Sequence, residues 1–139
     1  SALDQPVSPE QAIRGLVAAQ VEFLLRTPNM MRLMAREMVD HGARRSQDII
    51  LEIAAGVFDR LCRVIEAGQR AGTFRSDIEP RFGAVSTVAQ VAYFILARPA
   101  IAIFLGAGAT GVSDETARAF ARHAGIFAVH ALSRAEETP

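Results

Sequence analysis

The chain has 139 residues, of which 50% are hydrophobic and 22% are charged, so it is long enough for one globular domain and too apolar to be disordered. Its formal net charge is zero, whereas segments that grip nucleic acid by its phosphates usually carry a basic excess, so we expect no direct nucleic-acid contact. The single cysteine, Cys62, excludes an intrachain disulfide, and residues 1–12 lack the basic start and apolar centre of a signal peptide. We therefore expect a cytoplasmic protein and, because no methionine opens the chain, part of a longer one.

The first half of the chain predicts three helices. Residues 8–11 (Ser-Pro-Glu-Gln) have the form of a capping box with a proline in the first turn, and Thr27-Pro28 should end the helix that they begin. Asn29 is expected to cap a short second helix, which Gly42 ends in a left-handed conformation. A long third helix is expected from about residue 44 to residue 71, because apolar residues recur there at spacings of three and four.

The second half predicts two more helices. Asp77 is expected to cap a fourth helix, and Arg98-Pro99 should kink or interrupt it. Residues 106–111 form a glycine-rich loop, and a last helix should run from Ser113 to about Ser133. The expected fold is therefore all-α, with five to six helices in one domain over residues 8–133, a disordered lead over 1–7 and a tail over 134–139.

The last helix is apolar nearly all round, which indicates burial on more than one side. One side can face the core of the domain, and a second copy of the chain is the simplest cover for the other. Small residues in its middle would let a neighbouring helix approach closely. We therefore expect a homodimer whose interface includes Phe82, Val85, Phe104, Phe120, Ala121, Ala124, Phe127 and Ala128.

Two patterns resemble functional motifs without their context. Residues 106–111 read Gly-Ala-Gly-Ala-Thr-Gly, a literal GxGxxG, but we expect no second strand after the last helix, and Asp114 and Glu115 would repel a pyrophosphate at its start. The apolar stretch 82–105 is broken by Arg98-Pro99, and the uninterrupted part is shorter than the roughly 20 residues that a membrane span needs. We expect an interhelix loop and a buried helix, with no membrane contact.

Neither a metal site nor a catalytic site can be recognised in the sequence. His123 and His130 lie seven residues apart on one helix, too far for the pairing of zinc enzymes, and His41 lies elsewhere. Cys62 has no histidine or acidic partner on its own helical face, which favours an inert, buried thiol. No acid–base pair stands out, so we expect no enzymatic activity, no metal and no cofactor.

The second helix is rich in methionine, a residue that is frequent both in ordinary cores and at adaptable binding surfaces. Ordinary core packing accounts for this pattern at least as well as the functional alternative, which is the wall of a mostly apolar pocket for a small molecule. Tyr93 and Gln90 are polar groups within an apolar stretch, and such groups need a partner in the protein or in a ligand. The candidate ligand-binding residues are Phe23, Met34, Met38, Phe58, Cys62, Gln90, Tyr93 and Phe94.

Several segments resemble the C-terminal domain of TetR-family transcriptional regulators. The closest match is residues 68–80, which fit the family's "G-x-x-x-G-x-F/I-R-x-D-x-x-P" junction between two helices. Residues 23–28 resemble the end of the helix that follows the family's linker helix, residues 33–37 its short pocket-lining helix, and residues 97–99 a motif of one subgroup. The resemblance covers about residues 8 to 133 and lacks the family's N-terminal helix-turn-helix domain.

The resemblance implies a repressor's effector-sensing and dimerisation domain. Two copies would pair through their last two long helices in a four-helix interface, and a mostly hydrophobic small molecule would bind between the first four helices. Binding would alter the spacing of two DNA-reading domains outside this chain. Two alternatives remain: a helical enzyme or lipid-handling domain, which would need a polar pair near Tyr93, and a purely structural dimerisation module, whose pocket its own side chains would fill.

Overall fold

The computed structural model describes residues 6–42, 44 and 47–135, without the side chains of residues 49–51 and 53. The expected lead and tail fall largely outside this part of the chain. The described residues form six α-helices, one short 3-10 turn and no β-strand, with one isolated bridge between Phe74 and Ser133. The elements are α1 (Pro9–Arg26), α2 (Pro28–His41), α3 (Gln47–Arg70), α4 (Pro80–Leu96), α5 (Arg98–Phe104), η2 (Gly108–Thr110) and α6 (Asp114–Leu132).

The predicted start of α1 is confirmed. The backbone N–H of Gln11 donates to the Ser8 hydroxyl, and the N–H of Ser8 donates to the Gln11 side chain, both at 3.2 Å. This reciprocal pair satisfies two N–H groups that have no partner within the helix. The predicted left-handed end of α2 at Gly42 is confirmed too, with a φ of 58°.

Two predicted caps are wrong. Thr27, not Asn29, precedes α2, because Pro28 fits the first helical position and starts the helix two residues early. Glu79, not Asp77, caps α4, and its carboxylate accepts from the N–H of Phe82 at 3.0 Å. Asp77 instead pairs with Arg75, whose Nε lies 2.6 Å from the Asp77 carboxylate.

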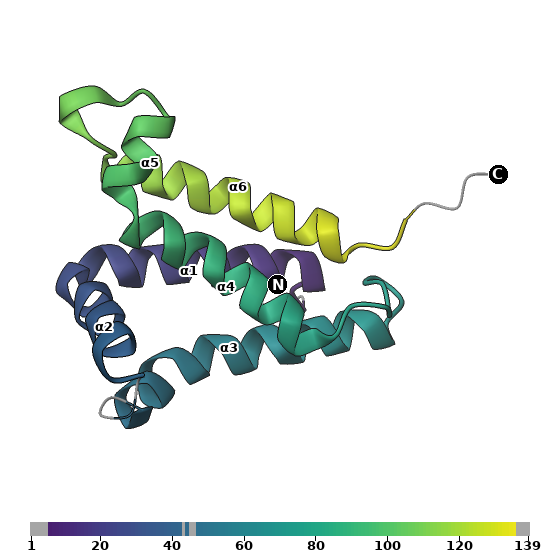
Figure 1. Cartoon of the computed structure of the whole chain (residues 1–139). Coiled ribbons are helices and arrows are strands. Elements are labelled where there is room, and N and C mark those ends of the chain that lie inside the picture. The colour runs from purple at the N-terminus through teal and green to yellow at the C-terminus, as the bar shows by residue number, and fades with distance from the viewer. Residues whose placement is uncertain (1–5, 43, 45–46, 136–139) are drawn as a thin grey trace.

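Helix α1 lies at the centre of the fold and packs on α6, α3 and α4 (Figure 1). Helix α4 also contacts α3 and α6, while α2 bridges the end of α1 and the start of α3 at one edge. The prediction of an all-α domain is therefore confirmed. Among the first four helices, α2 makes the least contact with the rest of the domain.

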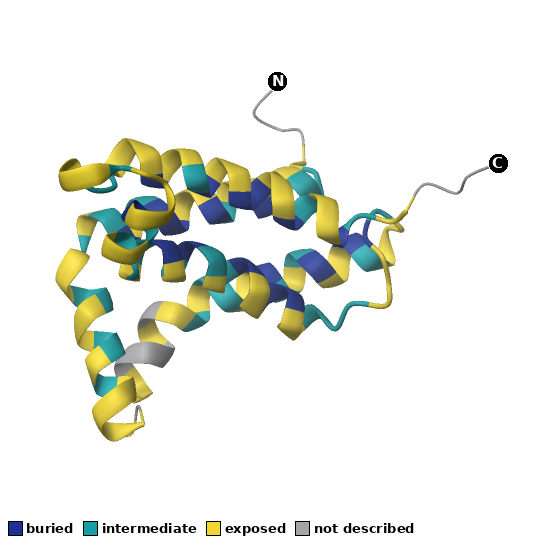
Figure 2. Cartoon of the chain, turned by 45° about the horizontal axis from the view of Figure 1, so that its top comes forward, coloured by how far each residue is buried: buried dark blue, intermediate teal, exposed yellow. Residues whose placement is uncertain are grey.

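The core consists of two clusters, which appear as the dark blue faces of α1, α3, α4 and α6 in Figure 2. The first cluster lies between α1, α4 and α6 around Val21, Val91 and Phe94. The second lies between α1, α3, α4 and α6 around Ile13, Leu61 and Ala84. Helix α2 contributes no buried residue to either cluster, so it covers the domain more loosely than its neighbours do.

The predicted break at Arg98-Pro99 is confirmed, because α4 and α5 meet there at an angle of 88°. Arg98 Nη1 lies 3.0 Å from an Asp114 carboxylate oxygen, so the ion pair connects the corner to the start of α6. Among the described helices, no single one is long and apolar enough to cross a membrane; α4 and α5 pass that test only as this bent pair.

The small residues of α6 do admit a neighbouring helix closely, but that neighbour is α1 of the same chain. A Cβ at Gly125 would lie 3.2 Å from Arg14 Cγ, and the adjacent Ala124 is 1% exposed. Ala121 and Ala128 are likewise buried, at 2% and 4% exposure. These three alanines therefore belong to the core of one chain, and their assignment to a dimer interface is corrected.

Candidate functional site

Helix α2 lies at one edge of the bundle, where it contacts α1 and α4 (Figure 1). Its methionines Met30, Met31 and Met34 are half-buried, whereas Met38, one turn further on, is 53% exposed. Helix α2 makes only limited contact with α1 and α4. A helix with a half-buried apolar side and no buried residue has little packing to hold it in one position.

Two polar side chains lie inside the domain on α1 and α4, which pack on one another. Gln20 of α1 is 7% exposed, and its Nε2 donates to the Val88 carbonyl of α4 at 3.1 Å. Thr87 of α4 is 3% exposed, and its hydroxyl donates to the Gly83 carbonyl at 2.8 Å. Sequence reasoning missed Gln20, although its position relative to Val17 and Leu24 places it on the apolar face of α1.

The eight predicted ligand-binding residues are distributed over several environments. Phe94 is buried, Met34, Phe58, Cys62 and Gln90 are half-buried, and Phe23, Met38 and Tyr93 are exposed.

Three of these predicted ligand-binding residues, Phe58, Cys62 and Phe94, take part in core packing. Phe58 and Cys62 of α3 pack on the second core cluster, and burial, followed by the nearby Glu66 carboxylate, raises the pKa of the Cys62 thiol. A raised pKa disfavours the reactive thiolate. The expectation that no acidic residue shares the helical face of Cys62 is wrong, because Glu66, four residues further on, lies near the thiol, and Cys62 is half-buried rather than buried. Phe94 stacks on Phe120 of α6, with ring centroids 4.1 Å apart.

Tyr93 and Phe94 are adjacent on α4. Both line an apolar groove of about 460 Å³ between α4, α5 and α6. Tyr93 is 59% exposed, and Phe104 and Phe120 line the groove with it. Besides the Tyr93 hydroxyl, the only polar side chain along this groove is that of Thr116. The polar pair that a catalytic use of Tyr93 would need is not found among the groove-lining residues that the structure describes.

A further groove, of about 440 Å³, lies where the α1–α2 junction meets the corner between α4 and α5. Leu24, Met31 and Ile95 form part of its apolar wall, while Arg98 and Asp114 line its polar side. Because Arg98 pairs with Asp114, the charge of the guanidinium is largely compensated.

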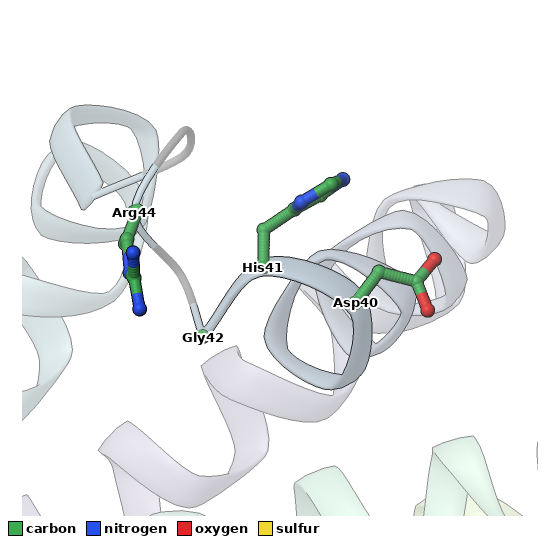
Figure 3. A pocket seen from close by; sticks show the side chains of 4 residues that line it. All are labelled: Asp40, His41, Gly42 and Arg44. Carbon is green, nitrogen blue, oxygen red and sulfur yellow. The ribbon is translucent and has the colours of Figure 1, made fainter.

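A hollow of about 430 Å³ lies beside the connection between α2 and α3 and is lined by Asp40, His41, Gly42 and Arg44 (Figure 3). The three charged or polar side chains point in different directions, and all are exposed. In the described parts of the chain, no three His, Cys, Asp or Glu residues are grouped so that they could hold a metal ion.

Four of the predicted interface residues lie on the outside of the domain. Phe82, Val85, Phe104 and Phe127 are 74%, 54%, 78% and 57% exposed. They belong to α4, α5 and α6. Phe120 is half-buried beneath the ring of Phe94. A contiguous exposed apolar patch is typical of a surface that contacts another molecule, so these four residues remain candidates for an interface.

Comparison with known proteins identifies the family. The family model described as "Tetracyclin repressor-like, C-terminal domain" matches residues 9–124, which is most of the chain. The chain belongs to this family.

One curated relative is a transcriptional repressor. The chain is 42% identical over 74 residues to the HTH-type transcriptional repressor NicS of Pseudomonas putida KT2440. The matched part spans 50% of this chain and only 34% of the relative. The comparison with solved structures finds no significant match.

Proposed function

We propose that this chain is the effector-sensing and dimerisation domain of a TetR-family repressor and that it acts by binding rather than by catalysis. The observation that carries the proposal is the family match over residues 9–124, joined to the loose packing of α2 over the interior. The relative's name, a transcriptional repressor, supports repression as the output.

The proposed effector site is the interior beneath α2, between α1, α3 and α4. The half-buried methionines of α2 suit a mostly hydrophobic small molecule, because their flexible side chains adapt to irregular shapes. An effector that prefers one position of α2 over another would shift the population of the two states. Helix α3 follows α2 in the chain and would carry that shift across the domain.

The proposed partner is a second copy of this chain, bound through the exposed apolar side of α4, α5 and α6. Phe82, Phe104 and Phe127 supply large side chains that a closed symmetric interface would bury. DNA binding would reside in another part of the protein, and effector binding would change the separation of its two copies across the dimer.

Native mass spectrometry of the purified chain tests both parts together. A mass of two chains plus a reproducible small molecule is the expected result, and the extra mass would characterise the effector. A bare dimer that binds no small apolar molecule would argue for a structural dimerisation module instead. A monomer at all concentrations would overturn the proposed dimer interface.

A further inference from the structure

The groove of about 440 Å³ at the corner between α4 and α5 combines an apolar wall with charged side chains. Residues of α1, α2, α4, α5 and α6 line it, and none of the described lining residues belongs to α3. It is therefore a different space from the interior between α1, α3 and α4 that we propose for the effector. Its volume lies within the range of small-molecule sites, roughly 300–1,000 Å³.

The apolar wall of this groove is part of the packed core. Leu24 of α1 is a buried member of the first core cluster, and Met31 of α2 and Ile95 of α4 pack against that cluster. Because the core holds these side chains in place, an apolar surface of fixed shape is available before any ligand binds. Such preorganisation lowers the entropic cost of binding.

Arg98 lines the charged side of the groove and retains unused donors. Its Nη1 lies 3.0 Å from an Asp114 carboxylate oxygen and 3.5 Å from the Val112 carbonyl oxygen. Its Nε and Nη2 donate to no residue that the structure describes. The N–H donors of a guanidinium form a planar fork that matches both oxygens of a carboxylate. A ligand carboxylate would therefore find donors on Arg98 while the pair with Asp114 is retained.

Arg32 of α2 supplies a charge that the groove does not compensate. It is exposed, lines the groove and forms no ion pair with any other residue that the structure describes. The lining thus contains two guanidinium groups and one carboxylate, that of Asp114, which leaves one positive charge in excess. A ligand with a single negative charge complements this excess, whereas a dianion would exceed it.

We propose that this groove is a second small-molecule site, which binds a monocarboxylate with an apolar body. The carboxylate pairs with Arg32 and accepts hydrogen bonds from Arg98, and the body packs on the apolar wall. Such a ligand connects α2 with the corner between α4 and α5, so it adds contacts to the helix that the domain holds most loosely. The inference goes beyond the proposed effector site and does not depend on it.

Calorimetric titration of the purified chain at neutral pH tests the proposal with two matched pairs of probes: octanoate against octanamide, and cinnamate against cinnamamide. The members of each pair have nearly the same shape, but only the carboxylate is charged. We expect the carboxylate to bind about tenfold more tightly, the effect of a hydrogen-bonded charge pair. Added salt should reduce this preference, because Arg32 is exposed. The pair with the larger preference shows whether the site favours an aliphatic or an aromatic body.

Three variants locate the carboxylate. Arg32→Met should remove most of the preference, because it deletes the excess charge. Arg36→Met, one turn further along α2 and outside the lining of the groove, deletes the same charge and should preserve the preference. Leu96→Glu, at a lining position that is 42% exposed, should weaken binding of the carboxylates more than binding of the amides.

Equal affinity of the wild type for both members of each pair would overturn the inference. A carboxylate preference that survives both Arg32→Met and Leu96→Glu would overturn it too, because the carboxylate would then bind elsewhere. The same holds if no probe binds at millimolar concentration. None of these results counts against the proposed sensing function, which native mass spectrometry tests separately.

Discussion

The ring of Phe74 occupies the space that a Cβ atom at Gly68 would need, and the backbone N–H of Phe74 donates to the Gly68 carbonyl at 3.0 Å. The chain can double back at this point because Gly72 adopts a φ of 78°. Phe74 thereby reaches the second core cluster, and the N–H of Arg75 donates to the Leu132 carbonyl at the end of α6. The spacing of Gly68, Gly72 and Phe74, which carried the family resemblance, therefore has a direct packing reason.

Gly68→Ala should destabilise the domain by about 1–3 kcal/mol, because the new methyl group forces the Phe74 ring out of its position. Denaturant unfolding followed by circular dichroism measures the effect. Gly56→Ala is the matched control on the same helix, since nothing lies within 4 Å of a Cβ there, and it should be neutral or stabilising by up to about 1 kcal/mol. Equal effects of the two substitutions would contradict the proposed packing of Phe74.

Ala124→Arg should prevent folding of the single chain, with a loss of roughly 4 kcal/mol or more, because Ala124 is 1% exposed in the first core cluster. Ala131→Arg, at an exposed position of the same helix, should fold normally. Helix content by circular dichroism distinguishes the two. A folded Ala124→Arg chain, whether monomer or dimer, would show that α6 does not pack on α1 as described.

Phe104→Glu and Phe127→Glu should convert a dimer to a folded monomer, because each places a carboxylate on the exposed apolar side of α5 or α6. Both side chains are more than half exposed, so the fold itself should survive. Sedimentation velocity measures the oligomeric state. Val39→Glu on α2, at a position that is 84% exposed and away from this side, should leave the dimer unchanged. Persistent dimers of both phenylalanine variants would place the interface elsewhere.

Stability should fall as the pH drops below about 4.5. The Arg118 side chain of α6 donates a hydrogen bond from Nε to the Glu22 carboxylate of α1 at 2.6 Å. This hydrogen bond lowers the pKa of the Glu22 carboxyl from 4.5. A carboxyl whose pKa is lower in the folded state stabilises the fold above its unfolded pKa, and this contribution is lost as the pH falls through the folded pKa.

Glu22→Gln should therefore reduce the difference in stability between pH 7 and pH 3, with a small effect because both side chains of the pair are more than 40% exposed. Urea midpoints at the two pH values provide the measurement. A larger pH dependence in the variant than in the wild type would contradict the direction of this pKa shift.

The sequence by itself determined the helices and most of their limits. The capping box at Ser8, the left-handed Gly42, the break at Arg98-Pro99 and the cap at Ser113 all act within a few residues, so local patterns suffice to predict them. The errors at Thr27 and Glu79 arose where two residues could each cap the same helix and the position of a proline decided. The family followed from the junction after Gly68 for the same local reason.

Only the tertiary structure decided which surfaces those helices bury. Helical spacing shows that α6 is apolar on two sides, but small residues such as Ala124 suit close approach by any helix, and α1 of the same chain fills that place. Tyr93 and Phe94 are neighbours in sequence, yet their side chains diverge by about 100°, so one is exposed and the other stacks on Phe120.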